Sequence, residues 1–147
     1  MDTTTPDLVP AHFDRLADET VALLTEAQHY FSHYLGDDKP RFDANAQIII
    51  TRENQRVTAR LAQIMAWILA EKALHSGEIA LGQLTSWQYS PPNTSFMTDP
   101  CDFTAENFPE ALRILLDKSY RLYLRVLRLD EMIRIKAGAA PTSPARD

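Results

Sequence analysis

The residues with a metal-binding spacing lie between positions 26 and 37. Four side chains of metal-ligand type recur there at intervals of three and four: Glu26, His29, His33 and Asp37. The Glu-x-x-His pair within this set is half of a carboxylate-bridged di-iron motif, whose other half and further inward carboxylates the sequence lacks. On one helix the four residues share roughly one quadrant, opposite the apolar face. We therefore interpret them as a solvated helix face, with metal binding as the alternative.

Nucleophilic chemistry has one candidate, the single cysteine Cys101. Asp99 and Asp102 lie beside it, and neighbouring negative charge disfavours the reactive thiolate. A single cysteine also excludes an intrachain disulfide and a four-cysteine zinc site. The sequence carries no Gly-rich phosphate loop, no Gly-x-Ser-x-Gly elbow and no His-Glu-x-x-His motif. We therefore expect a protein without enzymatic activity and without a cofactor.

Arginine side chains form the second chemically distinctive set. Residues 1–47 carry nine acids and three bases, whereas residues 110–136 carry seven bases and four acids. This asymmetry favours either complementary packing of the two segments or a docking face for an acidic protein partner. The net charge of −5 and the pI of about 5.3 disfavour nucleic-acid binding, which stays a second alternative. The expected docking face comprises Arg52, Arg56, Arg60, Arg121, Arg125 and Arg128.

Amphipathic helices are expected to position all of these residues. Apolar side chains recur at spacings of three and four, and glycines such as Gly36 and Gly77 follow the patterns as C-terminal stops. We therefore expect an all-α fold, an elongated three-helix bundle in one domain. The expected segments are a flexible start (1–11), three helices (about 12–35, 43–76 and 109–136), a long connecting loop (77–108) and a disordered tail (138–147).

The middle of the second expected helix is apolar on every side. Residues 64–70 read Ile-Met-Ala-Trp-Ile-Leu-Ala, whereas a three-helix bundle buries about one stripe of each helix. This segment therefore needs a second cover, which is either the connecting loop or a second copy of the chain. For the second case we predict a homodimer interface at Met65, Trp67 and Leu69.

Two expected helices carry a pattern that points to a known family. The matching stretches are Arg56-Val57-Thr58-x-Arg60-Leu61, Trp67-Ile68-Leu69, Gly77-Glu78 and residues 119–130. In these stretches the chain resembles the regulator of CtrA degradation (RcdA) family of alphaproteobacteria, and the resemblance covers most of residues 12–136. It rests on helix patterns, because the family has no catalytic residue to carry over.

The resemblance implies a three-helix bundle that forms a homodimer and acts as a non-enzymatic adaptor. Such an adaptor helps deliver protein substrates, among them cell-cycle regulators, to the ClpXP protease alongside a response-regulator partner. A structural chaperone that covers another protein's apolar helix fits the same sequence. The chain has no apolar run near the roughly 20 residues of a membrane span and no basic start typical of a secretory signal. We therefore expect a cytoplasmic protein, which the resemblance would place at a cell pole.

Overall fold

Three long helices make up most of the chain. The structure, a computed structural model of the 147-residue protein, describes residues 5–33, 35–77, 97 and 108–136. Within these residues there is no strand, which confirms the all-α three-helix expectation. The elements are α1 (Thr5–His33), α2 (Leu35–Asp38), the 3-10 helix η1 (Lys39–Arg41), α3 (Ala44–Ser76) and α6 (Glu110–Lys136).

The helix ends lie close to the expected ones except at the start of the chain. Helix α1 begins at Thr5 rather than near residue 12, so much of the segment expected to be flexible is helical. The Asp43 side chain caps α3 by accepting from the Ala46 N–H at 2.9 Å, and Gly77 ends it at a φ of 83°. The expected disordered tail (138–147) lies outside the described residues, as does most of the loop 77–108.

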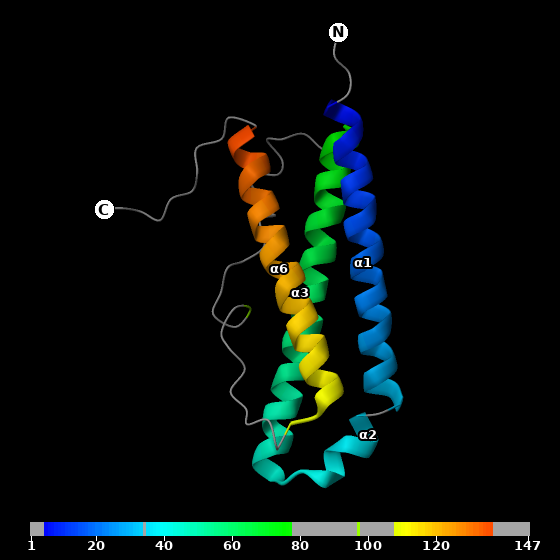
Figure 1. Cartoon of the computed structure of the whole chain (residues 1–147), viewed down its shortest axis with the longest axis vertical. Coiled ribbons are helices and arrows are strands. Elements are labelled where there is room, and N and C mark those ends of the chain that lie inside the picture. The colour runs from blue at the N-terminus through cyan, green and yellow to red at the C-terminus, as the bar shows by residue number, and fades with distance from the viewer. Residues whose placement is uncertain (1–4, 34, 78–96, 98–107, 137–147) are drawn as a thin grey trace, which may run out of the picture.

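The chain direction explains why the connection between α3 and α6 is long. In Figure 1, α1 runs antiparallel to α3, whereas α3 and α6 run side by side in the same direction. The chain must therefore return along the whole of α3, whose 33 residues span roughly 50 Å at about 1.5 Å per residue. At about 3.3 Å per extended residue, that return takes at least about 15 residues. A short turn of the kind that joins antiparallel helices cannot make this connection.

The core lies where the three helices face one another. Trp67 of α3 is almost fully buried, and its ring meets the edge of Phe13 of α1 with a centroid separation of 5.7 Å. From α6, the buried Tyr123 and Leu122 belong to the same core. The remaining fully buried apolar residues follow the stripes expected from the sequence, among them Ile50, Val57, Leu61, Ile64, Ile68, Leu112, Leu115 and Val126.

None of the described helices combines the length and the apolar character needed to cross a bilayer.

Candidate functional site

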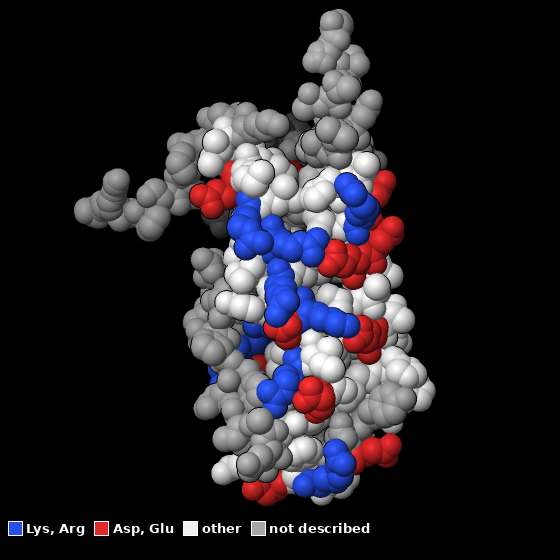
Figure 2. Space-filling model, in the orientation of Figure 1, with Lys and Arg blue, Asp and Glu red and all other residues white. Residues whose placement is uncertain are grey.

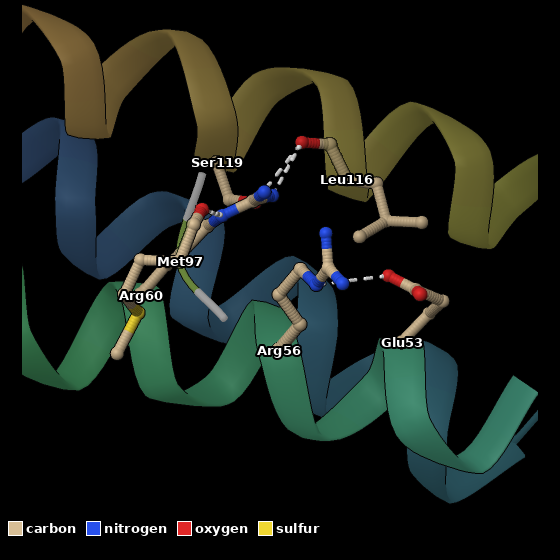
Figure 3. Close-up of polar contacts among 6 residues, drawn as sticks. All are labelled: Glu53, Arg56, Arg60, Met97, Leu116 and Ser119. Carbon is tan, nitrogen blue, oxygen red and sulfur yellow. Dashed lines mark hydrogen bonds and ion pairs between the residues drawn. The ribbon is translucent and has the colours of Figure 1, made fainter. Parts of the chain in front are cut away.

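The first unusual feature is a pair of arginines in the interior. Arg60 of α3 is only 3 % exposed, and it faces the first half of α6 (Figure 3). Its Nε donates to the Met97 carbonyl oxygen at 2.8 Å, and one terminal nitrogen donates to the Leu116 carbonyl oxygen at 3.1 Å and to Ser119 Oγ at 3.2 Å. The guanidinium also lies 5.0 Å from the centre of the Tyr120 ring. Arg60 therefore joins α3, α6 and the segment that connects them.

Arg56 lies one turn earlier on the same side of α3. It is 1 % exposed, and its Nε is 3.2 Å from Oε1 of the equally buried Glu53. Two opposite charges buried this close stabilise each other, whereas either one alone would leave an uncompensated charge in the core. We call the residues Glu53, Arg56, Arg60 and Ser119 the basic network (Figure 3).

A second polar group is buried near the far ends of α3 and α6. Trp67 Nε1 donates to Asp130 Oδ1 at 2.8 Å, and Arg134 Nε donates to Asp130 Oδ2 at 2.9 Å. Glu71 lies one turn beyond Trp67 and is 6 % exposed, and its Oε1 has no hydrogen-bond partner among the described residues. We call Trp67, Glu71, Asp130 and Arg134 the acidic cluster.

The surroundings of Glu71 disfavour its charged form. Burial raises the pKa of the Glu71 carboxyl above its ordinary value of 4.5, and the negative charge of Asp130 raises this pKa further. The charges of His75 and Arg134 act in the opposite direction and lower it by less. The acidic cluster therefore contains a group whose ionisation is coupled to the packing of the bundle.

Exposed ion pairs join α1 to the other two helices. Arg125 makes two hydrogen bonds to the Glu19 carboxylate, at 2.8 and 2.9 Å, which raise the pKa of the guanidinium. A second pair lies seven residues away on each helix, where Lys118 Nζ is 3.4 Å from the Glu26 carboxylate. Figure 2 shows the result as a column of basic side chains over α6 beside acidic side chains over α1. Complementary packing, expected from the charge asymmetry, therefore accounts for part of the basic character of α6.

The expected arginine docking face is divided by the fold. Arg56 and Arg60 are buried in the basic network, so the prediction that they face a partner is wrong. Arg125 is exposed but bound to Glu19, and Arg121 is exposed with its Nε 3.2 Å from Asp117. Arg52 and Arg128 are exposed on α3 and α6.

Apolar residues beyond Arg128 extend the exposed face of α6. Met132 and Ile135 are 63 % and 57 % exposed, although both are large and hydrophobic. Counting from Arg121, the positions Arg128, Met132 and Ile135 follow at seven, eleven and fourteen residues, which places all four on one side of the helix. We call these four residues the α6 strip. Its apolar half, Met132 and Ile135, was not predicted, although the spacing of these residues from Arg128 is visible in the sequence.

The predicted dimer residues occupy different environments. Trp67 belongs to the core and donates to Asp130, so it cannot be a surface contact, and its prediction is corrected. Leu69 is 59 % exposed and Met65 is partly buried. Glu53, Arg56, Arg60 and Glu71, the charged residues between positions 53 and 71, are all buried, so the outer surface of α3 there is uncharged. We call this surface the α3 outer face, and it comprises Thr58, Ala62, Met65, Ala66 and Leu69.

The proposed metal ligands lie on the outside of the bundle. The His29 and His33 rings are 4.5 Å apart, and Glu26 faces Lys118 of α6. Asp37 is in α2, outside the helix that carries the other three. Within the described ranges, no three His, Cys, Asp or Glu side chains come together as metal ligands. Cys101 lies outside the described residues.

One open hollow lies against the start of α3. Its volume is about 530 Å³. Arg52 is the charged residue on its described wall, and the exposed Ile48 lies beside it. The described lining comes entirely from α3 and consists of Ala44, Gln47, Ile48, Thr51, Arg52 and Gln55.

Comparison with known proteins identifies relatives of the whole bundle. The model of a family described as "Protein of unknown function (DUF1465)" matches residues 4–147. A solved structure, the crystal structure of RcdA from Caulobacter crescentus CB15, is similar with 29 % sequence identity and a TM-score of 0.61. The similarity covers 82 % of this chain and 89 % of that one. It confirms the resemblance found in α3 and α6, while no curated protein matches the sequence.

Proposed function

This chain belongs to the family described as protein of unknown function (DUF1465), and from that membership we propose that it is a non-enzymatic adaptor in regulated proteolysis. The likeness to RcdA is the observation that carries the proposal, and it supports a regulatory helical protein. In this proposal the protein helps deliver cell-cycle regulators to the ClpXP protease, together with a response-regulator partner. It works in the cytoplasm, where a fluorescent fusion would gather at a cell pole.

The α6 strip is the surface that we propose for partner binding. Arg128 is exposed and offers a guanidinium fork, which binds a carboxylate through two hydrogen bonds. Met132 and Ile135 add exposed apolar area on the same side, one and two turns further on. This combination fits a partner segment that carries an acidic residue followed by apolar residues.

The α3 outer face is the surface that we propose for homodimerisation. Its residues are uncharged and mostly small, so two copies could approach closely without burying an unpaired charge. Leu69 would be the main apolar contact of each copy. Met65 remains in the proposed interface, whereas Trp67 is left out of it because its side chain is buried.

The adaptor proposal is tested by reconstituted proteolysis. Purified ClpXP is mixed with CtrA and the response-regulator partner, and the loss of CtrA is followed with and without this protein. We expect the protein to accelerate CtrA loss several-fold, while ClpXP alone stays slow. Equal rates with and without the protein would contradict the proposal.

A matched pair of charge reversals separates docking from general electrostatics. Arg128→Glu reverses the charge within the α6 strip, and Arg15→Glu makes the same change on the exposed side of α1. We expect the first variant to lose the acceleration and the second to keep it. If both variants behave like the wild type, the α6 strip is not the docking surface.

Light scattering tests the dimer. We expect a mass near twice 16.7 kDa at micromolar concentration. Leu69→Asp places a charge in the α3 outer face and should give a folded monomer, because an unpaired charge is costly in a buried interface. Val21→Asp is the matched control, since Val21 is an exposed apolar residue on α1. A wild-type monomer, or a dimer that survives Leu69→Asp, would remove this interface.

A further inference from the structure

The acidic cluster holds two carboxyl groups in the interior, one from each of two parallel helices. Both oxygens of Asp130 accept hydrogen bonds, one from Trp67 and one from Arg134. Glu71 differs, because its buried Oε1 accepts no hydrogen bond from the described residues. A buried carboxylate without donors is unfavourable, whereas a neutral carboxylic acid at the same place is tolerated more easily.

The groups around Glu71 come from both helices. Asp130 and Arg134 approach from α6, and their charges act on Glu71 in opposite directions. His75 lies one turn further along α3, with its Nδ1 3.0 Å from the Glu71 carbonyl oxygen. The charged groups that face Glu71 therefore include one acid and two bases, and Asp130 has the largest single effect of the three.

Helix α1 contributes packing at this level rather than a facing charge. The Phe13 ring lies 5.3 Å from the His75 ring and 5.7 Å from the Trp67 ring, centre to centre, in edge-on contacts. The neighbouring Asp14 is exposed and pairs with Lys72 at 2.8 Å. All three long helices thus meet around Trp67 at the level of the acidic cluster.

We propose that Glu71 is a protonation switch for this end of the bundle. When Glu71 is neutral, the ends of α3 and α6 and the first part of α1 pack closely around Trp67. When Glu71 is ionised, its charge is repelled by Asp130 and is poorly solvated, so this end of the bundle loosens. At the other end of the bundle, Arg56 and Arg60 keep their charge in both states, because guanidinium groups do not titrate in this range.

Trp67 serves as an internal reporter of the switch. The sequence has two tryptophans, so Trp87→Phe leaves Trp67 as the only indole. In this background we follow the Trp67 emission maximum of the full-length chain between pH 4 and 9. We expect a shift to longer wavelength as the pH rises, with a midpoint above 4.5, because burial and Asp130 both raise the pKa of Glu71.

Variants of the cluster should move this transition in defined directions. Glu71→Gln should abolish the shift and keep the short-wavelength emission at every pH. Asp130→Asn removes the repelling charge and should move the midpoint to lower pH, whereas Arg134→Gln removes an attracting charge and should move it to higher pH. A purely structural role for Glu71 would not predict these opposite displacements.

Two controls make the result decisive. Glu131→Gln changes an exposed acid next to Asp130 and should leave the transition in place. The Glu71 side-chain carboxyl carbon, observed by NMR in the same background, should titrate with the midpoint seen in Trp67 emission. A transition that persists in Glu71→Gln, or a Trp67 signal that does not change while Glu71 titrates, would overturn the proposal.

Discussion

The basic network and the acidic cluster both place charged groups in the protein interior, but they compensate these charges to different degrees. Both bury charged side chains of α3 against α6, about three helical turns apart. In the basic network, Arg60 donates to two backbone carbonyls and one hydroxyl. Glu53 Oε1 accepts no hydrogen bond from the described residues, but its charge is compensated by Arg56, whose Nε lies 3.2 Å away. In the acidic cluster, the available donors go to Asp130, and one oxygen of Glu71 receives none.

The difference follows from what a helix interface can supply. Backbone carbonyl oxygens can accept additional hydrogen bonds, so a buried guanidinium with five N–H groups finds acceptors along a neighbouring helix. The backbone N–H groups in the middle of a helix are already used, so a buried carboxylate depends on side-chain donors. A buried arginine can therefore remain charged and act as a clamp, whereas a buried glutamate becomes sensitive to pH.

The largest effect is expected from breaking the buried pair in the basic network. Arg56→Met leaves Glu53 as an unpaired charge in the core and should lower the free energy of unfolding by about 3–5 kcal/mol, measured by urea denaturation. Adding Glu53→Met should restore most of this loss. Arg52→Met, an exposed change on the same helix, should cost less than about 0.5 kcal/mol. A small effect of Arg56→Met would show that the pair is not buried in solution.

A smaller loss of stability is expected when Arg60 is replaced by lysine, which keeps the positive charge but lacks the planar guanidinium group. Arg60→Lys cannot reach Met97, Leu116 and Ser119 together, because an ammonium group lacks the planar fork of a guanidinium. We expect a loss of about 1.5–3 kcal/mol by urea denaturation. Arg52→Lys is the matched exposed control. Equal stability of the two variants would mean that the charge of Arg60 matters and its geometry does not.

Removing a charge from the acidic cluster should raise the stability, whereas removing one from the basic network should lower it. The folded-state pKa of Glu71 is raised, so its contribution to stability is greatest below 4.5 and is lost as the pH rises through that folded-state pKa. Glu71→Gln should therefore stabilise the protein at pH 7.5 by on the order of 1 kcal/mol, with no gain at pH 4. Thermal unfolding at both pH values measures this. A variant that is less stable at pH 7.5 would place Glu71 among the stabilising charges, like Arg56.

The smallest effect is expected from the exposed ion pairs between α1 and α6. The coupling between Glu19 and Arg125, measured by a double-mutant cycle with Glu19→Gln and Arg125→Met, should be about 0.2–1 kcal/mol and should fall in 1 M salt. A coupling well above about 1 kcal/mol, or one that does not fall in 1 M salt, would show that this pair does not behave as a solvent-screened surface pair.

The sequence predicted the helix boundaries more accurately than it predicted which charged residues are buried. Apolar periodicity and the Gly77 stop are local signals, and they placed α3 and α6 to within about a residue at each end. The arginines at positions 52, 56 and 60 repeat every four residues, which is also the pattern of a solvated helix face. Two of them are buried: Arg60 binds acceptors on α6 and at Met97, far away in the sequence, and Arg56 lies 3.2 Å from the buried Glu53 of its own helix.

The sequence by itself determined an all-α chain of three long helices, its resemblance to the RcdA family and the charge asymmetry between its first and last helices. These depend on residues within a few turns of one another. Only the tertiary structure decided which charges are inside, that Trp67 is a core residue and that the outer surface of α3 is uncharged. The physical reason is that burial of a charge depends on donors and acceptors from other helices, and no local pattern records which helix will lie beside which.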